Sequence, residues 1–314
     1  MKRFLMIVMI MCSAVLGFAE KESFVKYTMN GNDGFGSPVE INFKYIVSDN
    51  EVTITNYSTS YRYRMTITIP STIDGLPVTT IGERAFYSFF SKAYITGITI
   101  PDSVTTIGEG AFESCEDLES IAVSNTHPVY AFIDGVLFNK KEKSLHTYLM
   151  ANRISNYTVP KGIITIGEGA FIGCKNLESI TIPNSVTTIG EGAFESCNDL
   201  KSITIPDSVT TIGKSAFEGC EDLESIAVSN THPVYAFIDG VLFNKKEKSL
   251  HTYLRTNKAS SYTVPNSVIT IGEGAFESCE NLTLHVDDGS YLHKYAIENE
   301  LSFEVIPDTS WLEE

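Results

Sequence analysis

Short stretches in which apolar and polar residues alternate recur along most of the chain. In the stretch 177–182, LESITI, Ile180 and Ile182 should point inward from one strand, while Ser179 and Thr181 should point outward. The proline that follows ends the strand, because it cannot donate a hydrogen bond to a neighbouring strand. Comparable stretches begin at residues 98, 121, 157, 180, 203, 226 and 262, at steps of 23, 36, 23, 23, 23 and 36 residues.

The step of 23 residues indicates a stack of similar coils. After each predicted strand, a second apolar set returns the chain through the interior, as Val186, Ile189, Ala193 and Phe194 do. One such coil cannot bury its apolar side alone, whereas stacked coils share a continuous core. A period of 20–29 residues with this spacing is typical of leucine-rich repeats. We therefore expect a β-rich repeat solenoid, a curved leucine-rich-repeat superhelix with a parallel sheet on one face.

Two coils are longer, at residues 121–156 and 226–261, and each contains a predicted β-hairpin in place of the usual return segment. Residues 116–149 and 221–254 are identical over 34 positions and lie 105 positions apart, which indicates an internal duplication. A modular array tolerates such copying, whereas an enzyme with a single assembled active site rarely does.

Both ends of the array have the pattern of terminal caps. Residues 41–46 and 51–57 alternate like a hairpin. At the other end, Ser290 is a good N-cap for a helix over 291–299, and residues 303–305 would form a last strand. Caps of this kind shield the last apolar coil of a solenoid.

The first residues have the form of a secretory signal peptide. Lys2 and Arg3 precede the apolar run 4–12, and small residues around Ala19 give a cleavage position. We expect a mature chain with no integral membrane span that is exported to the cell surface, the periplasm or the medium. The predicted division is a signal peptide at 1–19, an N-terminal cap at 20–64, a solenoid at 65–281, and a C-terminal cap and tail at 282–314.

A Gly-x-Gly pair in the hexapeptide IGEGAF recurs at 107–112, 166–171, 189–194 and 271–276, with near-copies at 81–86 and 212–217. A phosphate-binding loop needs a longer glycine frame and occurs once, so no cofactor site is expected. The second glycine is dispensable, because Arg84 and Ser215 replace it. The first glycine is present in all six copies, and we expect it to serve a tight turn.

The formal net charge is −16, from 23 Lys and Arg against 39 Asp and Glu, which argues against nucleic acid as a partner. A glycosidase needs two carboxylates that face one cleft, and no calcium-loop motif is present. The acidic clusters are duplicated, so solvated turn charges are the favoured interpretation. They are Glu113, Glu116, Asp117 and Glu119, repeated as Glu218, Glu221, Asp222 and Glu224.

Neither the histidines nor the cysteines have the spacing of a metal site. His127, His146, His232 and His251 each stand alone within a coil, which favours structural or solvent-facing positions. Beyond the signal peptide, the cysteines are Cys115, Cys174, Cys197, Cys220 and Cys279. A column of small buried thiols is the favoured interpretation. A disulfide among Cys174, Cys197 and Cys220 is the alternative, because only these three have a cysteine in an adjacent coil.

Long motifs in this sequence resemble those of BspA-like leucine-rich repeat proteins, also called the Treponema pallidum type. The motif I-P-x-x-V-x-x-I-G-x-x-A-F-x-x-C occurs at 100–115, 182–197 and 205–220, and DGVLFNK at 134–140 and 239–245. The resemblance implies a bacterial or protist surface or secreted protein, of the adhesin or surface-antigen type. It also implies binding to host matrix proteins such as fibronectin and fibrinogen, or to other cells, and it brings no catalytic residues.

The outward strand positions are the natural binding surface of such a solenoid. They carry small hydroxyl groups, which predict weak and repetitive contacts: Thr68, Thr99, Ser120, Ser179, Thr181, Ser202, Thr204 and Ser225. We therefore expect an exported, non-enzymatic protein that binds host matrix proteins, host cell-surface proteins or other bacterial cells. The alternatives are an enzyme that acts on surface glycans, and a structural or antigenic surface protein without a specific ligand.

Overall fold

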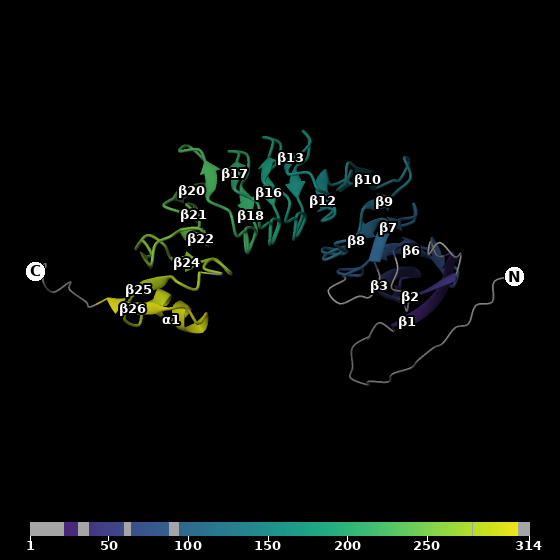
Figure 1. Cartoon of the computed structure of the whole chain (residues 1–314), viewed down its shortest axis with the longest axis horizontal. Coiled ribbons are helices and arrows are strands. Elements are labelled where there is room, and N and C mark those ends of the chain that lie inside the picture. The colour runs from purple at the N-terminus through teal and green to yellow at the C-terminus, as the bar shows by residue number, and fades with distance from the viewer. Residues whose placement is uncertain (1–21, 31–37, 60–63, 88–93, 278, 307–314) are drawn as a thin grey trace, which may run out of the picture.

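The computed structural model describes residues 22–30, 38–59, 64–87, 94–277 and 279–306. The coils follow one another along an arc, with an N-terminal sheet at one end and the helix α1 (Tyr291–Glu298) at the other (Figure 1). The signal peptide predicted at residues 1–19 lies outside the described residues. No helix in the described part of the chain is long and apolar enough to cross a membrane.

The N-terminal end of the arc is a mixed sheet. The predicted N-terminal hairpin is present, and its buried residues include Ile41, Phe43 and Ile54. A parallel pairing then joins the hairpin to the first repeat strands. The strands of this sheet are β1 (Ser23–Asn30), β2 (Pro38–Ser48), β3 (Glu51–Thr59), β5 (Thr72–Ile73), β6 (Leu76–Ile81) and β8 (Thr106–Ile107).

The predicted strands of the ITIP type pair in parallel. Ile180 pairs with Ile203, and Ile203 with Ile226, and all three side chains are buried as expected. These strands form three sheets: β4 (Arg64–Thr68), β7 (Tyr94–Thr99) and β9 (Ser120–Ala122); β13 (Asn156–Thr158), β15 (Ser179–Thr181), β17 (Ser202–Ile205) and β19 (Ser225–Val228); and β23 (Ser261–Thr263), β25 (Thr283–Asp287) and β26 (Phe303–Ile306). The breaks fall at the two 36-residue coils.

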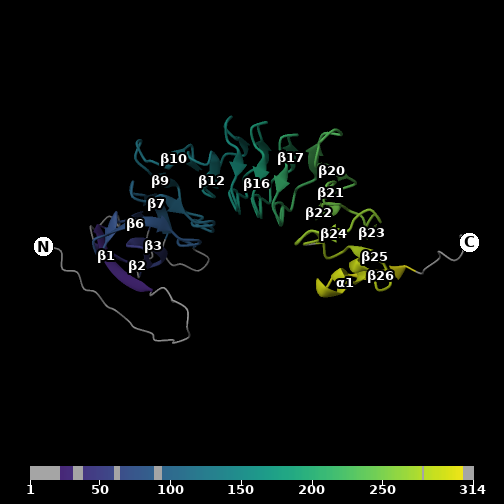
Figure 2. The ribbon, with the colours of Figure 1, turned by 180° about the vertical axis from the view of Figure 1, so that it is seen from behind.

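A second parallel ladder runs through the return segments. Its two-residue strands lie nearer the inside of the arc than the ITIP-type strands (Figures 1 and 2). They are β14 (Thr165–Ile166), β16 (Thr188–Ile189), β18 (Thr211–Ile212) and β24 (Thr270–Ile271). The sequence pattern predicted a buried return segment but not this pairing.

Each 36-residue coil contains the predicted hairpin and one further strand. In the first hairpin coil (residues 121–156) these are β10 (Tyr130–Ile133), β11 (Val136–Asn139) and β12 (Ser144–Tyr148). In the second hairpin coil (residues 226–261) they are β20 (Tyr235–Ile238), β21 (Val241–Asn244) and β22 (Ser249–Tyr253). The last strand of each hairpin pairs in parallel with the next return strand, so the hairpin takes the place of a return segment, as predicted.

Identical side chains stack from coil to coil in the core. The rings of Phe171, Phe194 and Phe217 follow one another with centroid distances of 5.2 and 5.8 Å. Four of the cysteines, Cys115, Cys174, Cys197 and Cys220, are buried as predicted, whereas Cys279 is half-buried, and every described cysteine is free. The Sγ of Cys197 donates to the carbonyl oxygen of Phe171 at 3.1 Å. Burial raises the pKa of Cys220 to about 12, which keeps that thiol protonated.

The first glycine of each IGxxAF turn lets neighbouring coils approach closely. A Cβ atom at Gly108 would lie 2.4 Å from the backbone nitrogen of Glu83. The tight-turn backbone lies instead at the second glycine position, where Arg84 and Ser215 both have a φ of 50°. The prediction that the first glycine serves a tight turn is therefore wrong, because that position is selected by the contact between backbones.

A tyrosine hydroxyl takes the place of the missing strand wherever the return ladder is interrupted. The backbone N–H of Ile107 donates to the Oη of Tyr130 at 2.8 Å, and that of Ile212 donates to the Oη of Tyr235 at 2.7 Å. At the C-terminal cap, the N–H of Ile271 reaches the Oη of Tyr291 at 3.5 Å. The predicted N-cap of α1 is also present, since the Ser290 hydroxyl accepts from the backbone nitrogen of His293.

Replacing Tyr130 by Phe tests this role. The change leaves the buried N–H of Ile107 without an acceptor, so we expect the free energy of unfolding to fall by about 1–3 kcal/mol. Urea unfolding followed by circular dichroism measures the loss. Tyr291→Phe is the control, because Tyr291 is exposed and its hydrogen bond is long. Equal losses in the two variants would contradict the assignment.

Candidate functional site

The predicted hydroxyl face is present but is divided between two sheets. Thr68, Thr99 and Ser120 lie on the sheet of β4, β7 and β9, whereas the five other positions lie on the sheet of β13, β15, β17 and β19. Thr99 and Ser179 are half-buried, and the six others are exposed. Ser179, Ser202 and Ser225 form one row across neighbouring strands. Each row offers hydrogen-bond donors and acceptors but little contact area.

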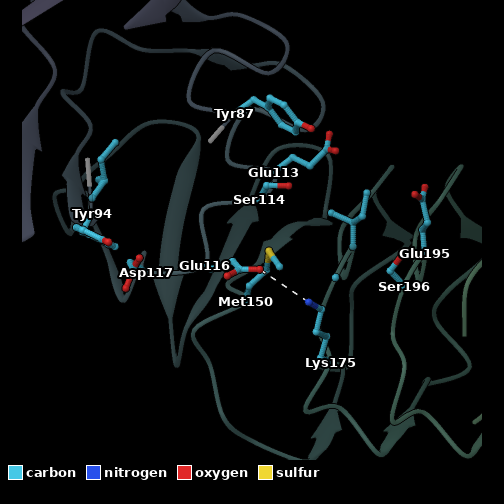
Figure 3. A pocket seen from close by; sticks show the side chains of 13 residues that line it. Tyr87, Tyr94, Glu113, Ser114, Glu116, Asp117, Met150, Lys175, Glu195 and Ser196 are labelled. Carbon is cyan, nitrogen blue, oxygen red and sulfur yellow. Dashed lines mark ion pairs between the residues drawn. The ribbon is translucent and has the colours of Figure 1, made fainter. Parts of the chain in front are cut away.

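A groove lies at the first hairpin coil (Figure 3). Its cavity has a volume of about 550 Å³. Met150, which follows β12, lies between the two walls. One wall is formed by Tyr87, Tyr94, Ile95, Glu113, Ser114, Glu116 and Asp117, and the other by Ile172, Gly173, Lys175, Glu195 and Ser196.

The groove exists because the first hairpin coil lacks a turn that its neighbours have. An ordinary coil continues from its return strand through G-E-G-A-F-x-x-C, whereas β12 runs directly into Leu149 and Met150. The turns of the flanking coils therefore face each other across a gap, and Met150 forms part of its lining. The amino-acid composition does not reveal this gap, but the absence of the G-E-G-A-F segment from this coil could have predicted it.

The groove is acidic. Among the described residues that line it, Glu113, Glu116, Asp117 and Glu195 supply four carboxylates and Lys175 supplies one ammonium, so their formal charge is 1 − 4 = −3. Burial raises the pKa of Glu195, and the nearby charges of Glu218 and Glu113 raise it further. Such a surface attracts cationic groups.

The carboxylates of the groove differ in how firmly they are paired. The Arg84 Nε donates to the Glu113 Oε2 at 2.8 Å. The Lys175 Nζ lies 3.8 Å from the Glu116 Oε1, which is an ion pair without a hydrogen bond (Figure 3). The Asp117 Oδ1 lies 3.7 Å from the Nη1 of Arg64. The prediction of solvated turn charges is wrong for Glu113, whose side chain is only 15% exposed and is paired with Arg84.

A second acidic feature, the acidic row, follows the third position of the IGxxAF turns. It comprises Glu83, Glu109, Glu168 and Glu191, which line one smaller cavity. Burial raises the pKa of Glu168 to about 7, together with a hydrogen bond to Glu109 and the charges of its neighbours. Glu109 and Glu168 are 59 positions apart in the sequence, so only the meeting of turns across the first hairpin coil brings them together.

At the positions that follow the Glu109–Glu168 pair by 105 residues, one of the two carboxylates is replaced by a cation. Lys214 stands 105 positions after Glu109, and its Nζ donates to the Glu273 Oε2 at 2.6 Å. The hydrogen bond from Lys214 lowers the pKa of Glu273. Sequence reasoning missed both pairs, although aligning the residue after each I-G pair would have shown the exchange of Glu for Lys.

The histidines have structural roles, as predicted. His127 is fully buried, and its Nδ1 accepts from the backbone nitrogens of Val129 and Tyr130. The Nε2 of His146 lies 3.0 Å from the carbonyl oxygen of Ile107. Burial lowers the pKa of both rings. Among the described residues, no group of three or more His, Cys, Asp and Glu side chains is placed to hold a metal ion.

Comparison with known proteins gives a family. The family model "BspA type Leucine rich repeat region" matches in six copies, over residues 39–140, 144–248 and 246–305. No curated protein gives a significant match.

Several solved structures are similar. A leucine rich cell surface protein from Faecalibacterium prausnitzii is 26% identical, with 83% of this chain and 70% of that chain covered and a TM-score of 0.44. A leucine-rich repeat protein from Eubacterium ventriosum is 22% identical, with 84% and 79% covered and a TM-score of 0.47. The leucine rich repeat protein of T. pallidum is 22% identical, with 83% and 95% covered and a TM-score of 0.30. On the family model, which matches most of the sequence, this chain belongs to the BspA type leucine rich repeat family.

Proposed function

We propose that the protein is an exported, non-enzymatic interaction module that binds proteins of the host matrix, such as fibronectin or fibrinogen, or of cell surfaces. The groove at the first hairpin coil carries this proposal. It places two tyrosines beside four carboxylates, and tyrosine is among the residues that dominate binding energy at protein interfaces. Tyr94 is 52% exposed at the start of β7, so its ring is open to a partner.

The hydroxyl rows extend the contact surface beyond the groove. Thr181, Ser202 and Ser225 are exposed on neighbouring strands and offer hydrogen bonds to a partner. Small hydroxyl groups contribute little each at an interface. The groove therefore supplies most of the affinity, and the rows add orientation.

The Glu109–Glu168 pair is the best position for a glycan-hydrolysing alternative, because the pKa of Glu168 is raised to about 7. A retaining glycosidase keeps its two carboxyl groups about 5–5.5 Å apart, and an inverting one keeps them further apart. Hydrogen-bonded carboxyl groups are too close to flank a sugar bond. Turnover of a glycan panel by the purified protein, abolished by Glu168→Gln, would establish the enzymatic alternative instead.

A binding assay tests the proposal. The mature chain should bind immobilised fibronectin, fibrinogen or whole bacterial cells saturably, and Tyr94→Ala should weaken that binding by about tenfold or more, because hot-spot side chains contribute on this scale. Surface plasmon resonance gives the affinities. Tyr291→Ala is the matched control, since Tyr291 is 53% exposed at the far end of the arc.

Two results would count against the proposal. Equal effects of Tyr94→Ala and Tyr291→Ala would remove the groove from the contact. A lack of saturable binding to any of these surfaces would favour a structural or antigenic protein. Fractionation of the producing cells, with N-terminal sequencing of the mature chain, tests export and the cleavage expected after Ala19.

A further inference from the structure

The duplication supplies an internal comparison for the groove. Because residues 116–149 and 221–254 are identical, Glu116 and Glu221 stand in the same local sequence. The first residue after each identical block differs: it is Met150 in the first copy and Arg255 in the second. In the second copy, the Arg255 Nη1 lies 3.3 Å from the Glu221 Oε1. The chain thus supplies its own guanidinium to this glutamate.

The arginine changes the shape of the second copy. The cavity around Arg255 is lined by Tyr253, Cys279 and Glu280 among others, and by none of residues 218–222. The ion pair between Arg255 and Glu221 spans the gap to the wall formed by residues 218–222. In the first copy, the shorter and uncharged Met150 leaves the equivalent wall open to the groove, and the cation beside Glu116 among the described residues is Lys175, whose Nζ lies 3.8 Å from the Glu116 Oε1.

We propose that the groove of the first hairpin coil binds an arginine side chain presented by a protein partner, with its guanidinium paired to Glu116. This inference rests on the proposed function, because the partner is a protein. The formal charge of −3 in the groove is complementary to the guanidinium, while Met150 and Ile172 offer apolar surface to its aliphatic stem. Lys175 is 61% exposed and moves aside when a better partner for Glu116 arrives.

Arginine fits this groove better than lysine. A guanidinium forms paired hydrogen bonds with carboxylates and stacks on aromatic rings, whereas an ammonium is more strongly hydrated and binds as a point charge. The groove provides both kinds of contact, since Tyr87 and Tyr94 line it together with the carboxylates. A lysine in the same place would lose the stacking.

Two charge-matched variants test the proposal. The probes are fluorescein-labelled hexa-arginine and hexa-lysine peptides, measured by fluorescence anisotropy on the full mature chain at 150 mM salt, where long-range attraction is screened. Glu116→Gln should weaken hexa-arginine binding by about tenfold or more, because it removes a charged hydrogen-bond acceptor. Glu221→Gln makes the same change of charge in the same local sequence and should leave the affinity within about twofold.

A third variant closes the groove without removing an acid. Met150→Arg builds the arrangement of the second copy into the first, so we expect a loss of hexa-arginine binding at least as large as that of Glu116→Gln. Circular dichroism of each variant checks that the fold is kept. Met150→Leu, which keeps an apolar side chain, should bind as the unchanged protein does.

The possible results separate this inference from the proposed function. Equal weakening by Glu116→Gln and Glu221→Gln, equal binding of the two peptides, or unchanged binding by Met150→Arg would each overturn the arginine site. Failure of the unchanged protein to bind hexa-arginine would overturn it too. Binding to fibronectin, fibrinogen or cells that survives Glu116→Gln but is weakened by Tyr94→Ala would overturn the arginine site while leaving the proposed function intact.

Discussion

Replacing Glu109 by Lys lowers the pKa of Glu168 from about 7 to below its ordinary value near 4.5. The variant builds into the first half the ion pair that the second half already has, where Lys214 donates to Glu273 at 2.6 Å and lowers the pKa of that carboxyl. Titration of the side-chain carboxyl signals by NMR measures the shift. Lys214→Glu is the reverse variant and should raise the pKa of Glu273.

The stability of the protein should follow this change in a defined direction. In the unchanged protein, Glu168 binds its proton more tightly when folded. The stabilisation that this proton gives to the folded state is therefore complete below pH 4.5 and is lost as the pH rises through about 7. In the Glu109→Lys variant the pKa of Glu168 in the folded protein is depressed. Glu168 therefore stabilises the folded variant above pH 4.5, and this stabilisation is lost at lower pH. The difference in urea midpoint between the two proteins should widen from pH 4.5 to 8 in favour of the variant.

Other titrating groups lie near the pair. Glu83 and Glu191 act on Glu168 through their charges and are present in both proteins. The charge of Glu109 raises the pKa of the nearby ring of His146, which burial lowers, so replacing Glu109 lowers the pKa of that ring further, and the NMR titration follows His146 as well as Glu168. A Glu168 that titrates near 4.5 in both proteins would show that the turns do not meet across the first hairpin coil.

Replacing Phe194 by Ala should destabilise the protein by about 3–5 kcal/mol, because the change leaves a cavity in the middle of the stacked rings. Phe194 is fully buried, and its ring stacks on Phe217 at an interplanar angle of 2°. Coils of a solenoid contact mainly their neighbours, so damage at a central coil uncouples the two halves. We expect urea unfolding to divide into two transitions.

Circular dichroism across a urea series checks this expectation. Ile269→Ala is the control, since Ile269 is 61% exposed and its removal leaves no cavity. A single cooperative transition with a midpoint close to that of the control would show that the ring column does not couple the coils.

Features with a local period could be predicted from the sequence. The inward isoleucines and the hairpins follow from spacing that one coil already shows, and the N-cap at Ser290 follows from a local helix-start signal. The family resemblance led to the same architecture. The second parallel ladder could not be predicted, because a strand of two residues such as β16 has no alternation to detect.

The groove and the acidic row depend on what is absent from a coil. Glu109 and Glu168 meet because the first hairpin coil lacks the turn that would separate them. The chemical difference between the two halves rests on single residues, Met150 against Arg255 and Glu109 against Lys214. A repeat pattern averages over such differences. Aligning the two halves of the sequence shows them, but which side chains each of these residues meets is seen only in the structure.

The tyrosine hydroxyls that complete the return ladder also bear on how the gene can change length. Tyr130 and Tyr235 accept from equivalent backbone N–H groups, those of Ile107 and Ile212. Either hairpin coil can therefore follow an ordinary coil without a new interface. Unequal recombination within the duplicated segment would add or remove 105 residues while keeping the hydrogen bonds at the junction. We expect alleles of this gene to differ in copy number, and the span of the arc to vary with them.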